Sequence, residues 1–307
     1  MAEIIFLGTG SAWRVPEHNC ECLICQKMKE LSEERTRSSL FIKTSKGILI
    51  DCGPDLLDQM KAQKLERPDV VLITHEHGDH FLGLDDLFAF KRTVPANSWN
   101  TIPVYASDLT WKAIEARFSY LLGTLIEKRI AVPGEPIDYF QDRIIPFKTD
   151  HGVSAPGSIG YVIETFEREK SKRIVYTSDF VGLPSEPDFI KNADALVFQA
   201  HWLNEPDVNK PSHMSFQRGL DFIRRWTPHG KVYLTHISGS DIVEGDPKNN
   251  TSKKPKCSHP LVHPLTGVTY PVPRCQSEWD AVVQAISADY ELGCNVFTAF
   301  DGLKVTV

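Results

Sequence analysis

Four metal-binding side chains fall within six positions of the stretch "VVLITHEHGDH", residues 70–80. An apolar run that is typical of a buried strand ends in His75, His77, Asp79 and His80. Because residues i and i+2 of an extended segment point the same way, His75 and His77 can reach one ion together. The chain then turns, so that Asp79 and His80 can face a second ion. Burying so many polar groups without partners would cost several kcal/mol. The pattern therefore predicts a metal site.

A second group of metal-binding residues lies near the N-terminus, in "EHNCECLIC" at residues 17–25. Cys20, Cys22 and Cys25 are close enough for one loop to present three sulfurs to a structural zinc ion, with free thiols as the alternative. The chain has seven cysteines, an odd number, and in a reducing compartment thiols bind metals or stay buried rather than form disulfides. Three thiolates would leave a tetrahedral ion one ligand short.

The elements that must position these residues follow from short β-branched runs that alternate with amphipathic stretches. Strands are expected at 3–7, 38–44, 47–51, 69–73, 102–106, 143–149, 158–165, 172–177, 194–199, 230–235, 294–299 and 302–307. Helices are expected near 24–34, 54–64, 81–91, 107–119, 215–226 and 277–291. Many strands mixed with helices favour an α/β protein with two sheets covered by helices. Asp301 and Gly302, between the last two strand-like runs, are typical of a hairpin turn.

One segment interrupts this alternation. Residues at about 243–275 are rich in Pro, Lys and Asn and have no clear period, which predicts a loop insertion rather than a domain. The insertion carries Cys257, His259, His263 and Cys275, so it is more than a plain linker. No repeat and no clean boundary divides the chain, and we expect a single domain over residues 1–307, with the cysteine loop at 18–26.

Composition limits the classes of partner. The chain has 307 residues, a net charge of −6 and a pI near 6.0, which argue against binding to long nucleic acids. No apolar run reaches the length of a membrane span, so no membrane partner is expected. The N-terminus has no basic region and no small-residue cleavage site, which favours a cytoplasmic protein. A homodimer stays an open alternative, because the sequence does not decide the oligomeric state.

The motif "THEHGDH" resembles the HxHxDH signature of the metallo-β-lactamase superfamily. Four further pieces stand in the family's order and at the ends of expected strands: "LIDCGPD" (49–55), "FKTDHG" (147–152), "IVYTSD" (174–179) and "VYLTHIS" (232–238). Their combination is far more specific than any one of them. The resemblance implies an αββα sandwich, in which two mixed sheets pack face to face with helices outside.

Carried over residue by residue, the resemblance implies two ions, zinc or manganese, in the active site. One would be held by His75, His77 and His151, and the other by Asp79, His80 and His236. Asp179 would bridge them together with a hydroxide, and Asp51 would orient a ligand. Two divalent ions less two carboxylates and a hydroxide leave about one positive charge, which favours a small anionic substrate.

The metal pair suits in-line displacement at phosphorus. We therefore expect a hydrolase, namely a phosphodiesterase on a small or cyclic phosphate ester, with the hydroxide as nucleophile. A thioesterase or lactonase of the same fold is the first alternative. A cofactor-biosynthesis metalloprotein, similar to the quinone-pathway relatives, is the second.

The cysteine loop resembles one branch of the superfamily, which includes the cyclic phosphodiesterase of the carbon–phosphorus lyase pathway and the pyrroloquinoline quinone biosynthesis protein B. In that phosphodiesterase the fourth zinc ligand is a His three residues after the last active-site His. Here that position is Gly239. We therefore expect the insertion to supply the fourth ligand, with His259 as the choice. The alternatives are that His18 completes the site, or that the insertion binds an ion of its own.

A further histidine, His213, lies where a general acid is expected. His213 lies in a loop before an amphipathic helix for which Ser215 is the N-cap. Superfamily phosphodiesterases have a similar His, aligned to protonate the leaving oxygen, and the rival interpretation is a plain loop His. Ser212 and the helix N-terminus could help to hold phosphate. His201, at a strand end, is a second candidate acid. The expected catalytic set is therefore His213 together with Asp79 and Asp51.

Overall fold

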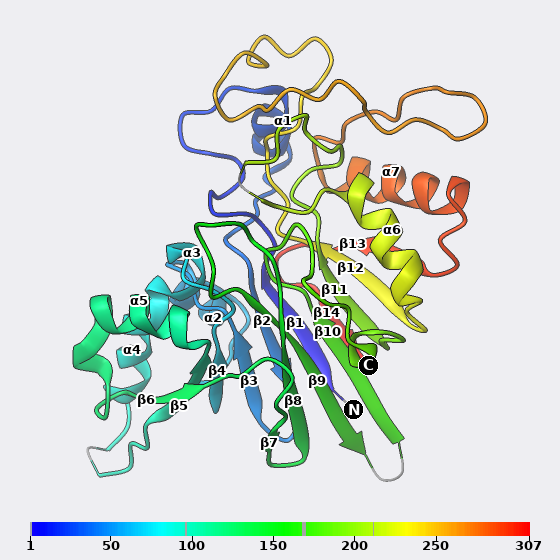
Figure 1. Ribbon diagram of the computed structural model, residues 1–307. Coiled ribbons are helices and arrows are strands. Elements are labelled where there is room, and N and C mark those ends of the chain that lie inside the picture. Colours follow the sequence, from blue (N-terminus) through cyan, green and yellow to red (C-terminus); the bar gives the residue numbers. More distant parts are fainter. Residues whose placement is uncertain (1, 96, 168–169, 211) are drawn as a thin grey trace.

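The computed structural model describes residues 2–95, 97–167, 170–210 and 212–307, and it contains two seven-stranded sheets packed face to face (Figure 1). The strands of the first sheet, in spatial order, are β14 (Lys304–Thr306), β1 (Glu3–Gly8), β2 (Ser39–Lys43), β3 (Gly47–Ile50), β4 (Val70–Leu72), β5 (Ile102–Ala106) and β6 (Ile126–Ile130). Strands β3 to β6 are parallel to one another, whereas β14, β1 and β2 are antiparallel to their neighbours. This sheet is therefore mixed.

The second sheet is also mixed. In spatial order its strands are β13 (Asn295–Thr298), β12 (Lys231–Thr235), β11 (Ala195–Gln199), β10 (Lys170–Tyr176), β9 (Ile159–Glu167), β8 (Asp142–Lys148) and β7 (Ile137–Tyr139). Strands β10 to β13 are parallel, so their carboxyl ends meet at one edge of the sheet. The loops that leave this edge lie beside the loop that leaves β4 (Figure 1).

The core between the sheets consists of side chains that alternate along the strands. Phe6 and Ile42 of the first sheet belong to the same buried cluster as Tyr161, Ile163 and Val197 of the second. Because every second residue of a strand faces this layer, the remaining apolar residues face outward and need a cover. Helices provide that cover on both sides, which confirms the predicted αββα sandwich.

The helices are α1 (Leu23–Leu31), α2 (Leu56–Ala62), α3 (Gly78–Phe81), α4 (Phe88–Lys91), α5 (Asp108–Phe118), α6 (Phe216–Trp226) and α7 (Gln276–Asp289). Short 3-10 turns are η1 (Leu82–Leu87), η2 (Ser119–Leu121) and η3 (Asp188–Ile190). Helices α2 and α5 pack on the first sheet through residues such as Leu56 and Trp111. Helices α6 and α7 pack on the second sheet through residues such as Trp226 and Val283. Among the residues described, no helix is long and apolar enough to cross a membrane.

Three local expectations differ from the structure. The edge strands β6 and β7 were not expected, because β6 exposes most of its side chains and the short strand β7 has no fully buried residue. The helix expected at 81–91 is divided into α3, η1 and α4. The turn at Asp301 and Gly302 does not close a hairpin, since β13 and β14 belong to different sheets. The Asp301 carboxylate instead accepts hydrogen bonds from Thr9 and Thr36.

The insertion at about 243–275 lies at the same end of the sandwich as α1 (Figure 1). Val243 packs in one small cluster with Val15, Ile24 and Met28. The backbone N–H of Leu23, at the start of α1, donates to Asp246 Oδ2 at 3.2 Å. The insertion is therefore fastened to the cysteine loop, far away in the sequence.

Candidate metal centre

The predicted metal ligands all follow strand ends, and the structure brings them together. His75, His77, Asp79 and His80 follow β4 and enter α3. His151 follows β8, Asp179 follows β10 and His236 follows β12. Ligands so far apart in the sequence can converge because each element is fixed by the sheet that carries it.

The first set is the predicted histidine triad. One ring nitrogen each of His75, His77 and His151 lies within 4.8 Å of the others. His151 Nε2 is 3.2 Å from His77 Nδ1. Thr74 Oγ1 lies 3.0 Å from His75 Nδ1, so the other nitrogen of that ring, Nε2, is left to face an ion.

The second set contains Asp79, His80 and His236, whose ligand atoms again lie within 4.8 Å of one another. His80 Nε2 is 3.1 Å from Asp79 Oδ2. The Asp179 carboxylate lies between the two sets: its Oδ2 atom is 3.0 Å from His236 Nε2, 3.5 Å from His80 Nε2 and 3.8 Å from His151 Nε2. This is the arrangement that a bridging ligand requires.

Three buried ring nitrogens indicate whether these residues can hold metal ions. The Nε2 atoms of His75, His80 and His236 are buried and have no partner with hydrogen-bond geometry among the residues that the structure describes. A buried polar atom without a partner costs free energy. Since the Nε2 atoms belong to clusters of imidazole and carboxylate ligands, divalent ions would satisfy them. The residues therefore fit a metal centre.

Asp51 lies behind the second set. Its Oδ2 atom is 2.7 Å from His80 Nδ1, while Thr74 donates to both carboxylate oxygens at 2.8 Å. The side chain is fully buried. An imidazole whose Nδ1 is held by a carboxylate presents Nε2 to the metal in a fixed orientation. The geometry thus supports the orienting role that was predicted for Asp51.

Burial and neighbouring charges shift the pKa values of the predicted metal ligands. Burial opposes ionisation of His80, yet Asp79 and Asp51 raise its pKa well above the ordinary value. Burial likewise opposes ionisation of Asp179, but His236 and His80 hold its pKa well below the usual range. Burial lowers the pKa of His75 well below its usual value, and His80 adds to this effect. The shift at His75 thus favours the neutral form that binds a metal, whereas His80 would have to give up the proton that Asp79 and Asp51 favour when an ion binds.

Residues of the site adopt left-handed backbone conformations. The φ angles are 59° at Asp51 and 60° at His236, and also 59° at Ser178 and 55° at Ser212, which precede Asp179 and His213. This region of φ is unfavourable for residues other than Gly. Such conformations persist where the surrounding structure over-determines them, and they cluster at functional sites.

His213 reaches the centre from the loop before α6, and Ser215 caps that helix as predicted by accepting a hydrogen bond from the N–H of Arg218. His213 Nδ1 lies 3.5 Å from Asp179 Oδ2, and its ring stacks on that of His201 at 4.1 Å. Burial, and next the neighbouring His201, lowers the pKa of His213 well below its ordinary value. Both candidate acids are therefore close together, and His213 directly adjoins the predicted bridging carboxylate.

Gln199, at the end of β11, fixes the orientation of His213. Its Oε1 atom accepts hydrogen bonds from the N–H groups of Phe180 and Met214 at 2.9 and 3.0 Å. The amide therefore turns its Nε2 atom toward His213 Nδ1, 2.8 Å away. An amide N–H donates to an unprotonated nitrogen, so the proton of neutral His213 is on Nε2.

The three cysteines also come together, but His259 does not join them. One Sγ atom of each of Cys20, Cys22 and Cys25 lies within 4.8 Å of the others. His259 is exposed, and its carbonyl oxygen accepts a hydrogen bond from Gln217 Nε2 of α6. The choice of His259 as the fourth ligand is corrected accordingly: the insertion brings Lys253 to the cysteines instead, with its Nζ atom 3.8 Å from Cys25 Sγ.

The structure joins neither alternative for the fourth ligand to the cysteines. His18 is exposed on the cysteine loop and does not belong to the group that the three sulfurs form. The other candidate ligands of the insertion lie apart: Cys257 lines a cavity, His263 Nε2 is 3.6 Å from Asp289 Oδ1, and Cys275 precedes α7. The described residues thus give no support to a separate ion within the insertion.

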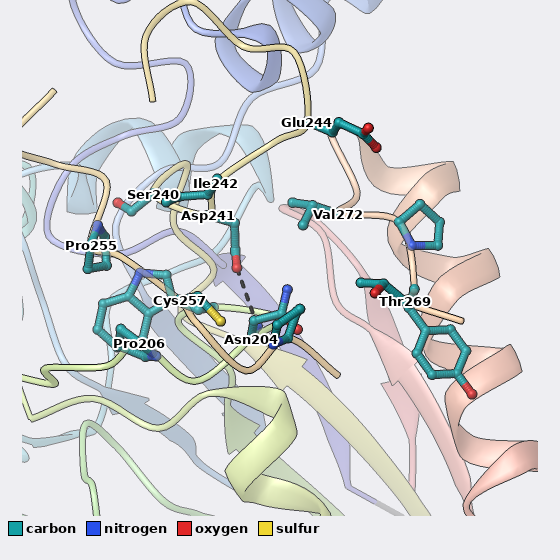
Figure 2. A pocket seen from close by; sticks show the side chains of 14 residues that line it. Asn204, Pro206, Ser240, Asp241, Ile242, Glu244, Pro255, Cys257, Thr269 and Val272 are labelled. Atoms are coloured by element: carbon teal, nitrogen blue, oxygen red, sulfur yellow. Dashed lines mark hydrogen bonds between the residues drawn. The ribbon is translucent and has the colours of Figure 1, made fainter. Parts of the chain in front are cut away.

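A cavity of about 360 Å³ lies between the insertion and the loop after β11 (Figure 2). Pro206, Ile242, Pro255 and Val272 make much of its wall apolar. The Asp241 carboxylate accepts a hydrogen bond from the N–H of Asn204, drawn as the dashed line in Figure 2, and others from the N–H of Leu203. None of the predicted metal ligands lines this cavity.

Three residues of these sites were not foreseen, namely Thr74, Gln199 and Lys253. Thr74 directly precedes the signature, so the strand end itself was the available signal. Gln199 directly precedes the "AHW" stretch in which His201 was considered. Lys253 stands among polar residues of the insertion and gave no signal, because a lysine is not a typical zinc ligand.

Comparison with known proteins agrees with this geometry. A family model described as "Beta-lactamase superfamily domain" matches residues 46–237, which contain all the predicted active-site ligands. The chain belongs to this superfamily. As a member it is a metal-binding hydrolase of the metallo-β-lactamase fold, and the predicted recognition is confirmed at that level.

The chain matches two curated relatives over different shares of their length. An octanoyltransferase from Porphyromonas gingivalis is 37% identical over 246 residues, which span 76% of this chain but only 45% of that protein. The chain thus spans less than half the length of this relative. A ribonuclease Z from Thermococcus kodakarensis is 24% identical over 274 residues, spanning 73% of this chain and 81% of that protein.

Two solved structures share the fold over the whole chain. A diphosphatase from the PhnP family superposes with a TM-score of 0.70 at 22% identity and covers 100% of this chain and 98% of its own. The Zn²⁺-bound PqqB from Methylobacterium extorquens also has a TM-score of 0.70, at 17% identity, with 99% and 100% covered. At these identities the likeness establishes the fold, and the second structure adds that this fold can hold zinc.

Proposed function

We propose that the protein is a dinuclear metal-dependent phosphodiesterase that acts on a small or cyclic phosphate ester. One observation carries the proposal: Asp179 Oδ2 lies within 3.8 Å of ring nitrogens from both ligand sets, as a carboxylate shared by two ions would. Two ions held side by side can contact both the attacking and the leaving oxygen of an in-line displacement at phosphorus.

Bound ions would supply a hydroxide nucleophile near neutral pH and positive charge for the phosphate oxygens. Residues of the chain would orient the metal ligands and stabilise the leaving group. Asp51 holds the His80 ring in place through Nδ1. His213, whose proton is on Nε2 because Gln199 occupies Nδ1, donates a hydrogen bond to the leaving oxygen as negative charge develops there.

The names of relatives support chemistry at phosphorus without deciding it. Ribonuclease Z and diphosphatase are names of enzymes that cleave phosphate linkages. The name octanoyltransferase refers to acyl chemistry, which the same hydroxide could perform at a carbonyl group. Thioester or lactone hydrolysis is therefore the outcome that competes with the proposal.

The test compares three substrate classes on the same metal-replete protein: an activated phosphodiester together with a cyclic nucleotide, an acyl thioester and a lactone. We expect hydrolysis of the phosphodiesters, loss of that activity after chelation, and recovery with zinc or manganese. Elemental analysis should find about three ions per chain, two at the active site and one at the cysteines.

Asp179→Asn and His77→Ala should remove the activity by separating or emptying the two ligand sets. His229→Ala is the matched control, because His229 is exposed and precedes β12, whereas the ligand His236 follows the other end of that strand. Cleavage of the thioester or lactone with no turnover of either phosphodiester would replace the proposal with an acyl hydrolase. Full activity in Asp179→Asn would contradict the bridged pair of ions.

A further inference from the structure

The cysteine cluster consists of three sulfurs, and among the described residues no fourth His, Cys, Asp or Glu ligand atom joins the group. Cys22 and Cys25 are fully buried, and Cys20 is half-buried at the start of the loop. Their Sγ atoms lie within 4.8 Å of one another, so one zinc ion can reach all three. What stands at the fourth corner decides what kind of metal site this is.

Lys253 lies beside the cluster without completing it. Its Nζ atom lies 3.8 Å from Cys25 Sγ. A Cβ atom added to Gly239 would lie 3.7 Å from the same Nζ atom, so the lysine fills the space that a side chain at position 239 would enter. The insertion thus places an amine where a side chain at position 239 would otherwise point.

The lysine is held there by the insertion. The next residue, Lys254, forms a fully buried ion pair with Asp246 at 3.1 Å, and Asp246 also accepts the N–H of Leu23 at the start of α1. Breaking a buried ion pair leaves an uncompensated charge, so this fastening is strong. Lys253 is therefore a fixed neighbour of the cysteines rather than a chance contact.

The amine is a cation and not a metal ligand. Lys253 Nζ lies 2.9 Å from Glu17 Oε1, as an ammonium paired with a carboxylate does. An ammonium has three donors and no free electron pair for a metal. A divalent ion with three thiolates carries a net charge of −1, which a nearby cation offsets.

Cys20 is partly exposed, so solvent can reach the cluster through this sulfur. A surface hollow of about 480 Å³ lies along the same loop and is lined by residues that include Arg14, Glu17 and His18. Glu17 belongs both to this hollow and to the ion pair with Lys253. A water molecule or another small donor could enter from this side.

We infer that Cys20, Cys22 and Cys25 hold zinc through three thiolates alone, that the fourth position is open to a small exogenous ligand, and that Lys253 offsets the surplus negative charge without binding the ion. The inference is independent of the reaction at the active site. With three protein ligands, the ion can exchange its fourth ligand with solvent, unlike an ion in a closed four-ligand site.

The first experiment reads the site by cobalt substitution of the full chain. Thiolate-to-cobalt charge-transfer absorption reports this site, because the predicted active-site ligands include no sulfur. We expect the band in the parent and its loss in a Cys20→Ser, Cys22→Ser double variant, which also supplies the spectrum to subtract. Added imidazole should shift the cobalt d–d bands that remain after subtraction. No charge-transfer band in a folded, cobalt-replete parent, or bands that do not respond to imidazole, would overturn the inference.

A variant with a built fourth ligand gives the matched comparison. Gly239→His combined with Lys253→Ala makes room for an imidazole at the fourth corner. This variant should lose the response to added imidazole and retain zinc against a chelator about tenfold better than the parent. An unchanged response and unchanged retention in a folded variant would show that position 239 does not face the ion, contrary to the inference.

The last experiment separates charge from ligation. Lys253→Met removes the charge at similar length, and we expect the zinc dissociation constant to rise about tenfold while the cobalt spectrum keeps its shape. Lys256→Met, at an exposed lysine of the same segment, should change neither. A changed cobalt coordination spectrum in Lys253→Met would make Lys253 a ligand, and an unchanged zinc affinity would make it a mere neighbour. Either result overturns the inference.

Discussion

Asp51 Oδ2 lies 2.7 Å from His80 Nδ1, on the side of the ring opposite the second set of metal ligands. A carboxylate in this position fixes the tautomer of the ligand and raises its basicity. We therefore expect Asp51→Asn, which keeps the size of the side chain but removes its charge, to lower the affinity of one active-site ion by about 10–100-fold. Chelator competition with zinc should measure this loss.

The control for Asp51→Asn is Asp85→Asn, since Asp85 is a surface residue that bonds to exposed Tyr120. It should leave both affinities unchanged. Equal metal affinities in Asp51→Asn and the parent would mean that the contact with His80 does not tune the metal site.

His213 separates a phosphodiesterase from a hydrolase that needs no acid. A nitrophenolate leaving group bears negative charge well, whereas a sugar or alkyl alkoxide needs a proton as it departs. A positioned general acid contributes about 10²–10⁴-fold. We expect His213→Ala to slow alkyl or sugar phosphodiesters by roughly that factor and nitrophenyl esters much less.

Both rates must be compared at matched metal occupancy, because His213 lies 3.5 Å from Asp179 and a disturbed metal centre would slow both substrates. Equal losses with intact metals would assign His213 to substrate binding rather than to stabilising the leaving oxygen through its Nε2–H group. No loss on either substrate would make it a plain residue of the loop before α6.

The sequence predicted most of the fold because the buried strands carry strong local signals. β5 was expected with its observed bounds, and the ends of β11 and β12 were expected to the residue. Where side chains are solvent-exposed, as in β6, burial leaves no pattern to read. The hairpin predicted at Asp301 was wrong for another reason. A turn motif fixes the local bend of the chain, but it does not determine which sheet the next strand joins.

The candidate metal centre was predictable because its ligands follow strand ends in one recognisable order. The fourth corner of the cysteine site was not, because it depends on the path of the insertion. Residue types favoured His259, whereas the buried pair of Lys254 and Asp246 places Lys253 beside Cys25. Contacts between segments more than 200 residues apart leave no periodic signal in either one.

Asp301 joins the C-terminal turn to the start of the chain. Its carboxylate accepts hydrogen bonds from the backbone N–H and the hydroxyl of both Thr9 and Thr36, at 2.6–2.8 Å. Asp301→Ala leaves two backbone donors without their partner, so the free energy of unfolding should fall by about 3–5 kcal/mol. Urea denaturation measures it.

Asp301→Asn should cost less, because one oxygen can still accept from the backbone. Asp138→Ala, at an exposed carboxylate of β7, should change the unfolding free energy by less than about 0.5 kcal/mol. If Asp301→Ala were as stable as Asp138→Ala, these hydrogen bonds would contribute little to the connection between the termini.

Asp241 should make stability fall as the pH rises. The side chain is buried beside the insertion, and burial raises its pKa to about 7, although the N–H groups of Leu203 and Asn204 oppose the shift. In the unfolded chain an Asp has a pKa of about 3.9. At pH values between these two pKa values, the Asp241 carboxyl is protonated in the folded protein and ionised in the unfolded chain. The contribution to stability is therefore full below about pH 4 and is lost as the pH passes through about 7.

Asp241→Asn removes this titration and keeps an oxygen that can accept from the N–H groups of Leu203 and Asn204. Other groups titrate alike in the parent and the variant, so the difference between their unfolding free energies isolates Asp241. From pH 5 to pH 8 the parent should lose stability relative to the variant, by an amount on the order of a few kcal/mol. Denaturant titrations at several pH values measure this difference, with Asp138→Asn as the exposed control. Parallel curves for the parent and Asp241→Asn would show that the Asp241 carboxyl ionises in the folded protein as it does in the unfolded chain.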